Sequence, residues 1–362
     1  MKSRLALLIL AAAVPIGAQT PTVQYQDDQA NMALAGFTSW KFSFQDAETI
    51  RFEGRGNPAT GSWKKQGLRA ESNEMAGLAR RENAGFFRLV EGTLKGAVKI
   101  FLKPAEIETI VSADQAILKE KGDSSQVTLT GATTVRRTGS TASSRGRTTE
   151  TLTVTGTGAT LDLATLTRPN RDPLREINFK GPVKVTRTAQ TALRQGGQEG
   201  SDLTLSGPSL VFLNADQKIL VPGAIQVEGS STASGKPATQ FTLRGSRGEV
   251  TLYPSQDRAD FPIALAEVSG RVRITLDTTK EVQSGQTVPV KLIGEADSLR
   301  FDDKKRTLRL LGNVVLSGSD TLMAGRITVR EALVTLNEKR EIVEIEMTGD
   351  PGEAQYEEKR KP

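Results

Sequence analysis

The stretch TLRLLGNVVLSGSDTLMAGRITVREALVTL, residues 307–336, decides the class of fold. It contains three apolar runs, separated by Gly312 and Asn313, by a polar turn and by charged residues. Apolar and polar residues mostly alternate within each run, which predicts β-strands with one apolar face. The other face of each run carries further apolar residues, which a strand that only covers a core does not need. The stretch therefore predicts strands around an interior wider than a simple core.

The composition agrees with a chain of strands and turns. Of the 362 residues, 34 are glycine and only 5% are aromatic, a mixture that favours strands and turns over an aromatic-rich globular core. Alternating runs follow one another through most of the chain. Residues 27–36 and 71–83 are the only helix candidates, and neither sustains an apolar stripe with a helical period. The sequence therefore predicts an all-β protein.

A recurring glycine gives the strands an order. A strand ends in glycine and an apolar strand follows within two residues, and this repetition predicts a stacked array. Glycine inside a strand usually marks a bend, so a bend at the same phase creases the sheet along a line. The polar stretches at 138–150, 194–201, 228–239 and 278–287 are expected to be solvated turns. The recurring glycines are Gly96, Gly131, Gly181, Gly223, Gly270 and Gly312.

The two ends of the chain are expected to differ from the repeats. Residues 1–18 combine a positive start, a short apolar run and a small-residue cleavage region, which is typical of a cleavable secretory signal peptide. An uncleaved anchor is the alternative, although the apolar run is too short to span a bilayer. We expect residues 19–31 to be a loose lead-in, 32–349 the repeated β region and 350–362 a charged flexible tail.

The alternation also assigns an inward phase to residues 307–336. On this phase the side chains are small and branched, which leaves room between two halves of a folded sheet. They form either a plain sandwich core or the floor of an apolar groove, and the pattern alone leaves both possibilities open. The inward side chains are Leu308, Leu310, Val314, Leu316, Ile327, Val329, Val334 and Leu336.

Residues 294–349 resemble the OstA-like (LptA/LptC) family of lipopolysaccharide-transport proteins. Their sequence is GEADSLRFDDKKRTLRLLGNVVLSGSDTLMAGRITVREALVTLNEKREIVEIEMTG. The family repeat has an Ala-Asp-x-Leu strand, a charged turn, a Leu-x-Gly-Asn-Val strand and a closing apolar strand that ends in glycine. Residues 111–118, VSADQAIL, followed by VTLTGATTV, look like a weaker copy. The chain departs from the family in its greater length and its extended polar loops. The matching positions are Asp297, Leu299, Gly312, Asn313, Val314 and Gly349.

The resemblance implies a fold and a function. The fold is an elongated folded-sheet β-jellyroll, or β-taco, built from stacked OstA-like repeats. The function is that of a periplasmic bridge that shields the acyl chains of lipopolysaccharide, or a similar glycolipid, in an apolar groove during transport to the outer membrane. Its partners are other transport proteins, or further copies of itself, joined by edge-strand addition. The alternative is a non-catalytic β-solenoid scaffold or adhesion protein of the cell envelope.

The resemblance and the inward phase together give a set of lipid-contacting residues. They lie on the strands within and just before the best-matching repeat. The expected lipid contacts are Val272, Ile274, Leu292, Leu299, Phe301, Leu308, Leu310, Val314, Leu316, Ile327, Val329, Val334 and Leu336.

The patterns of common enzymes are missing from the sequence. It contains no cysteine and no histidine, which removes the thiolate nucleophile, the usual general base and the commonest zinc ligand. Adjacent carboxylates at 27–28, 302–303 and 357–358 do not converge, because neighbours on a strand point to opposite faces. We therefore expect no enzymatic activity, no cofactor and no metal site. The scattered charges argue against nucleic acid as a partner.

Basic residues cluster near the best-matching repeat, and of two interpretations the second is favoured. They attract phosphorylated lipid headgroups at the rim of a groove, or they are ordinary outward positions that protect strand edges by charge. The cluster consists of Arg300, Lys304, Lys305, Arg306, Arg309, Arg326 and Arg330.

Overall fold

The computed structural model describes residues 23–27, 31–82, 85–102, 107–142, 146–164, 172–232, 239–253, 263–281, 287–319, 323–337, 342–349 and 353–358. In these residues nearly all regular structure is strand, with one 3-10 helix, η1 (Lys64–Gln66), and no α-helix. The all-β prediction is confirmed. Both helix candidates are wrong, because the described parts of each lie mainly in β2 (Met32–Phe44) and β4 (Leu68–Arg81). The expected signal peptide lies outside the described residues.

The chain divides into two compact units, which are described separately. Unit 1 consists of the described residues up to Arg137 together with Thr155–Phe179. Unit 2 consists of Thr138–Val154 together with the described residues from Lys180 onward. Two long strands, β7 (Ser124–Ala142) and β8 (Gly146–Ala164), contribute residues to both units.

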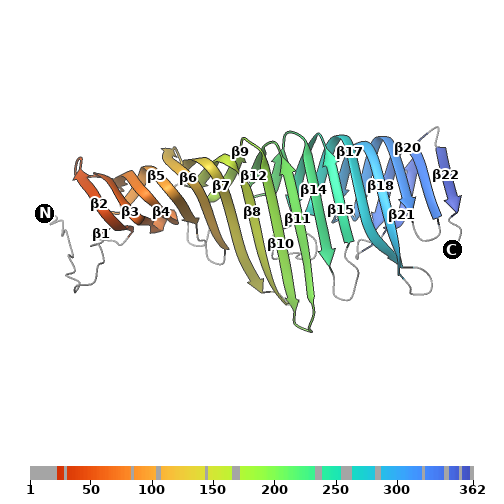
Figure 1. Cartoon of the computed structure of the whole chain (residues 1–362), viewed down its shortest axis with the longest axis horizontal. Coiled ribbons are helices and arrows are strands. Elements are labelled where there is room, and N and C mark those ends of the chain that lie inside the picture. The colour runs from red at the N-terminus through yellow and green to blue at the C-terminus, as the bar shows by residue number, and fades with distance from the viewer. Residues whose placement is uncertain are drawn as a thin grey trace. The chain divides into compact units, whose positions relative to one another are not determined.

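In unit 1 the strands pair antiparallel in chain order from β1 to β6 (Figure 1). The buried core includes Phe37, Phe52, Trp63 and Met75. The expected loose lead-in is wrong in part, because residues 23–26 form β1, which pairs with β2. The remaining strands of this unit are β1 (Val23–Gln26), β3 (Thr49–Trp63), β5 (Phe87–Leu102), β6 (Ile107–Lys121) and β9 (Leu174–Phe179).

In the described part of unit 2, thirteen further strands pair antiparallel. Those at its start are β10 (Val183–Leu193), β11 (Gln198–Gly207), β12 (Leu210–Leu213), β13 (Lys218–Val221), β14 (Ile225–Thr232), β15 (Thr239–Gly245) and β16 (Arg247–Leu252). Those at its end are β17 (Ile263–Glu281), β18 (Thr287–Asp302), β19 (Thr307–Ser319), β20 (Met323–Leu336), β21 (Ile342–Thr348) and β22 (Glu353–Glu358).

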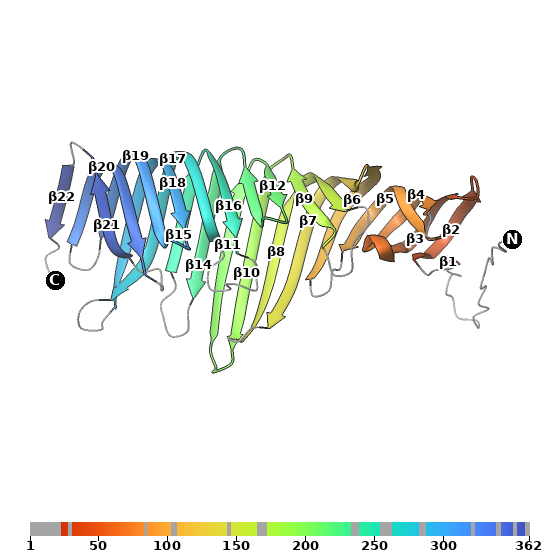
Figure 2. The ribbon, with the colours of Figure 1, turned by 180° about the vertical axis from the view of Figure 1, so that it is seen from behind.

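The sheet of unit 2 divides into two half-sheets at β17. The C-terminal half of β17 pairs with β15, in the ladder β10–β11–β14–β15 that we call half-sheet A (Figure 1). Its N-terminal half pairs with β16, in the ladder β12–β13–β16 that we call half-sheet B (Figure 2). Each of the long strands β18, β19 and β20 contributes one half to each half-sheet.

Bends carry the long strands from one half-sheet to the other. The pairing register shifts at residues 269–272, 295–298 and 311–314 of β17, β18 and β19. Two successive residues have positive φ in β17 (Gly270 at 80°, Arg271 at 50°) and in β19 (Gly312 at 74°, Asn313 at 47°). Each glycine faces a small polar side chain of the preceding strand segment, Ser246 at Gly270 and Asp297 at Gly312. The bends are therefore repeated bulges that only glycine fits without strain.

The predicted glycine series is correct at some positions and wrong at others. Gly96 and Gly131 have positive φ inside strands of unit 1, as Gly270 and Gly312 have in unit 2. Gly181 and Gly223 instead lie between strands, after β9 and β13. At these two positions the strand is interrupted rather than bent, and Pro182 and Pro222, which cannot donate to a ladder, stand beside the glycines.

Two expectations about irregular segments are also corrected. Within the expected flexible tail, residues 353–358 form β22, which pairs with residues 323–328 of β20. In three of the four expected solvated turns the described residues are strand, because the apolar alternation fades there while the ladder pairing continues. Residues 194–197 do form the turn between β10 and β11, as predicted. The other described parts of these stretches belong to β7 and β8, to the start of β11, to β14 and β15, and to β17 and β18.

Candidate functional site

The predicted lipid-contacting residues all lie on inward positions of unit 2. Apart from Phe301 and Ile327, which are half-buried, each of them is buried. Outward neighbours such as Arg309 and Thr328 are exposed, so the inward phase read from the sequence is confirmed. Half-sheet A holds Val272, Ile274, Leu292, Val314, Leu316, Ile327 and Val329. Half-sheet B holds Leu299, Phe301, Leu308, Leu310, Val334 and Leu336.

A cavity of about 90 Å³ lies between the half-sheets. Phe301, Leu308 and Val334 form one cross-strand row on its half-sheet B side. Of the predicted residues, Ile274, Leu299, Phe301, Leu308, Val334 and Leu336 line it. The sequence analysis missed the other lining residues, which are Ser231, Thr239, Phe241, Leu243, Ile263, Ala266 and Leu276.

The remaining predicted residues do not line this cavity. Leu310 and Val314, which flank the bend at Gly312, are fully buried in close packing. Gly294 has the side chains of Ile274, Leu310 and Leu316 around the position that a Cβ would take, with the nearest atoms at 2.9 Å. The interior is therefore packed beside the bend and hollow farther from it.

A row of hydroxyl side chains crosses half-sheet A beside the cavity. Ser201 pairs with Ser231, and Ser231 pairs with Thr239. The hydroxyls of Thr239 and Thr278 lie 3.3 Å apart. Residues directly opposite each other in an antiparallel ladder point to the same face, so this hydroxyl row follows the inner face of half-sheet A. It consists of Ser201, Ser231, Thr239 and Thr278, all of which fall in stretches that the sequence predicted to be turns.

One charged side chain lies inside this apolar environment. Arg187 of β10 is 1% exposed, and its Nε donates a hydrogen bond of 2.5 Å to Oε1 of Glu150 on β8. Both terminal guanidinium nitrogens are buried without a hydrogen-bond partner among the described residues. Removing an ion from water costs several kcal/mol unless its hydrogen bonds are replaced, so one ion pair leaves much of this cost uncompensated. The sequence offered a signal, because Arg187 occupies the inward phase of Val183, Val185 and Ala189.

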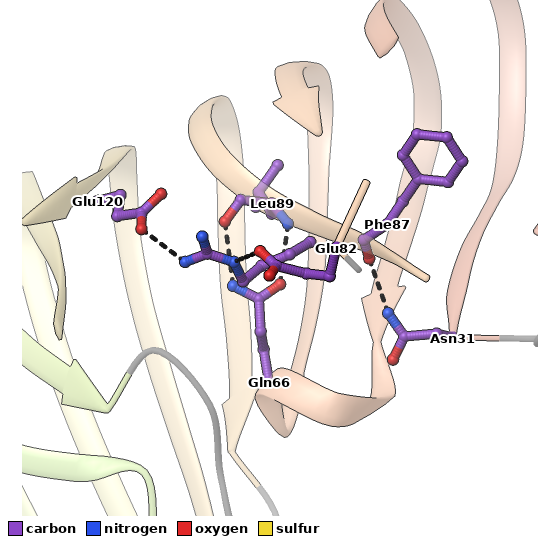
Figure 3. A network of polar contacts seen from close by, with 7 residues as sticks. Asn31, Gln66, Glu82, Phe87, Leu89 and Glu120 are labelled. Carbon is purple, nitrogen blue, oxygen red and sulfur yellow. Dashed lines mark hydrogen bonds and ion pairs between the residues drawn. The ribbon is translucent and has the colours of Figure 1, made fainter. Parts of the chain in front are cut away.

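By contrast, the polar side chains of the network in unit 1 form hydrogen bonds or ion pairs with other groups of the fold (Figure 3). The Asn31 amide donates to the carbonyl of Phe87 at 2.7 Å, and Gln66 both donates to and accepts from the Leu89 backbone at 3.0 and 2.9 Å. Arg88 pairs with Glu82 and Glu120 at 2.6 and 2.7 Å. These side chains complete the hydrogen bonding of the start of β5, so we assign the network a structural role.

Burial alone would lower the pKa of Arg88, but its two carboxylate partners outweigh that effect and the pKa is raised. The guanidinium thus stays charged and paired, which agrees with a structural role.

The predicted basic cluster includes outward residues that pair with carboxylates. Arg300 lies 2.6 Å from Glu267, and Arg309 lies 2.6 Å from Glu331, on neighbouring strands. The hydrogen bond from Arg309 lowers the pKa of Glu331 from its ordinary 4.5. Because the folded-state pKa is lowered, this pair stabilises the fold above about pH 4.5 and loses its effect as pH falls through the lowered value. These contacts favour the interpretation of ordinary outward charges.

Apolar side chains are exposed at the C-terminal end of unit 2. β21 pairs with residues 331–336 of β20, and there Val343 is 64% and Met347 is 41% exposed. The glutamates Glu344 and Glu346 alternate with them. One side-chain phase of β21 is therefore apolar and exposed in the described residues.

Comparison of the chain with protein-family models, curated proteins and solved structures finds no match. Within the described residues, no group of three or more acidic side chains is placed to hold a metal ion. The described part of the chain also contains no helix of the length and apolarity needed to cross a membrane. Of the carboxylates at 302–303, Asp303 accepts a hydrogen bond from Tyr253 and Asp302 accepts one from the backbone of Lys305.

Proposed function

We propose that the protein is a periplasmic lipid-binding bridge that shields the acyl chains of lipopolysaccharide, or of a similar glycolipid, between the half-sheets of unit 2 during transport to the outer membrane. The observation that carries the proposal is the apolar lining of the cavity between the half-sheets, beside the hydroxyl row. Because the cavity has a volume of only about 90 Å³, the half-sheets must move apart when an acyl chain enters. An amphiphile needs this combination of an apolar interior and a polar margin. The role is one of binding without catalysis.

Two further features support the proposal. The resemblance of residues 294–349 to the OstA-like family suggests the folded-sheet β-taco form, in which lipid lies between two halves of one sheet. The division of the sheet at β17 and the repeated bends are compatible with that form. The exposed apolar side chains of β21 suit strand addition by another transport protein or a second copy.

Site-specific photo-crosslinking in cells tests the proposal. A photoreactive residue at Phe301, which lines the cavity, is expected to capture lipopolysaccharide or an analogous glycolipid. The matched control is the adjacent Arg300, which is exposed on the outer face and is expected to capture much less. Equal capture at the two positions would show that lipid does not enter between the half-sheets.

A second candidate is a non-catalytic β-scaffold or adhesion protein of the envelope. The close packing of Leu310 and Val314 favours it, because a scaffold needs a filled interior. The two candidates differ in the effect of filling the cavity by Ala266→Val. A scaffold is expected to be unchanged or stabilised in thermal unfolding and to keep its function, whereas a lipid carrier is expected to lose lipid capture at Phe301.

A further inference from the structure

Arg187 has more hydrogen-bonding capacity than the fold uses. An arginine guanidinium carries five N–H donors in a planar fork. Nε is matched by Glu150 at 2.5 Å, while the two terminal nitrogens have no partner among the described residues. An aliphatic side chain at this position would continue the inward apolar phase of Val185 and Ala189 without that cost. Core packing therefore does not explain why a guanidinium with these two unpaired nitrogens is buried at this position.

The groups around Arg187 indicate which kind of ligand could accept hydrogen bonds from its terminal nitrogens. Planar bidentate pairing is the geometry in which guanidinium recognises a carboxylate or a phosphate. Farther along the same face, buried hydroxyls are present at Thr191, four residues beyond Arg187 on β10, and at Thr148, whose hydroxyl lies 2.9 Å from that of Thr191. Ser201, opposite Ala189, begins the hydroxyl row two residue pairs from Arg187. The site suits an anion that accepts several hydrogen bonds.

An inward row connects Arg187 to the cavity. Arg187 is opposite Leu203, Leu203 is opposite Gly229, and Gly229 is opposite Phe241, which lines the cavity. Three interstrand spacings give a path of roughly 14 Å along half-sheet A. Gly229 has no side chain, and the Phe241 ring occupies the place its Cβ would take, at 2.4 Å. The row is thus apolar from the guanidinium to the cavity, with the hydroxyl row beside it.

We propose that Arg187 anchors the carboxylate or phosphate of an anionic amphiphile whose acyl chain follows this row into the cavity. The inference rests on the proposed lipid-binding function and adds to it the class of ligand and the residue that selects its charge. Because the terminal nitrogens are enclosed, the side chains around Arg187 must move to admit the anion. Association is therefore expected to be much slower than diffusion allows.

Equilibrium dialysis of the full chain with dodecanoate, dodecyl phosphate and dodecanol, below micelle formation, tests the inference. The wild type is expected to bind at least one anion about ten-fold or more tighter than dodecanol, the size of a charge-assisted hydrogen bond. Comparison of the two anions distinguishes a carboxylate from a phosphate ligand. The variant Arg187→Met/Glu150→Gln removes both charges and is expected to bind all three with the affinity of dodecanol. Arg273→Met, an exposed residue paired with Glu295 at 3.2 Å, is the control and keeps the preference.

The outcomes separate the two proposals. If dodecanol binds but the anions bind no tighter, or if the double variant keeps the anion preference, the role of Arg187 is overturned while lipid binding stands. If none of the three binds the wild type, both proposals fail. If the double variant does not fold, Arg187→Lys keeps the charge without the planar fork. That variant is expected to lose several-fold in anion preference, and an unchanged preference would overturn the inference.

Discussion

At the scale of single residues, Gly312 forms the bend of β19 and lies against the Asp297 side chain, which holds the bend in place. Its φ of 74° is in the left-handed region, and a Cβ there would come within 2.3 Å of Oδ2 of Asp297. That carboxylate accepts a hydrogen bond of 2.8 Å from the side chain of Asn313. The Ala-Asp and Gly-Asn motifs of the sequence are therefore two sides of one bend, on neighbouring strands.

We predict that Gly312→Ala lowers the free energy of unfolding by about 1–3 kcal/mol, through backbone strain and loss of space. Urea unfolding measures the change. Gly318→Ala on the same strand is the control, because its nearest atoms would be 3.9 Å away and its φ is not positive. It is expected to be neutral or slightly stabilising. An equal loss in the two variants would remove the bend as the explanation.

At the scale of elements, β21 and β22 cover different halves of β20. β21 pairs with residues 331–336, and β22 pairs with residues 323–328. Deleting residues 350–362 removes β22 and frees the backbone groups of β20 that it binds. A freed strand edge is a template for pairing between chains, so the deletion is expected to raise self-association.

We predict that Val343→Lys/Met347→Lys reduces concentration-dependent self-association and partner binding without unfolding the protein. Both side chains are exposed, so the replacement sacrifices little packing, while charge on an edge opposes strand addition. Sedimentation velocity across a concentration series measures the effect. Thr348→Lys adds charge at an exposed polar position of the same strand and is expected to change association less. If both replacements act equally, net charge rather than the apolar face governs association.

Sequence periodicity was sufficient for the strands and for the inward phase around Leu308 and Val334, because alternation directly reports which face is buried. It failed where pairing continues without apolar alternation. The hydroxyls of Ser231 and Thr239 are on inward positions, yet their Ser- and Gly-rich segments resemble turns. β22 was missed for a similar reason, since a charged segment is held there by backbone pairing with β20. Arg187 was visible as a charge in an apolar phase, but its unmatched nitrogens depend on tertiary packing.

At the scale of the whole molecule, stability is distributed along ladders of neighbouring strands. In unit 1 the strands from β1 to β6 pair in chain order, and in unit 2 the long strands from β17 to β20 do the same. In such quasi-one-dimensional architectures, stability is close to a sum of local and nearest-neighbour terms. A destabilising substitution in one unit is therefore expected to lower stability mostly within that unit.

We predict that Trp63→Ala, in the core of unit 1, speeds amide hydrogen exchange in β2 to β5 and leaves β17 to β20 protected. Trp63 is 1% exposed and packs 6.3 Å from the ring of Phe52, so truncation should cost about 3–5 kcal/mol locally. The reciprocal variant Leu310→Ala, which costs about 2–5 kcal/mol in unit 2, should have the opposite pattern. Exchange followed by mass spectrometry measures both. Loss of protection in both units from either variant would mean that they unfold as one cooperative body.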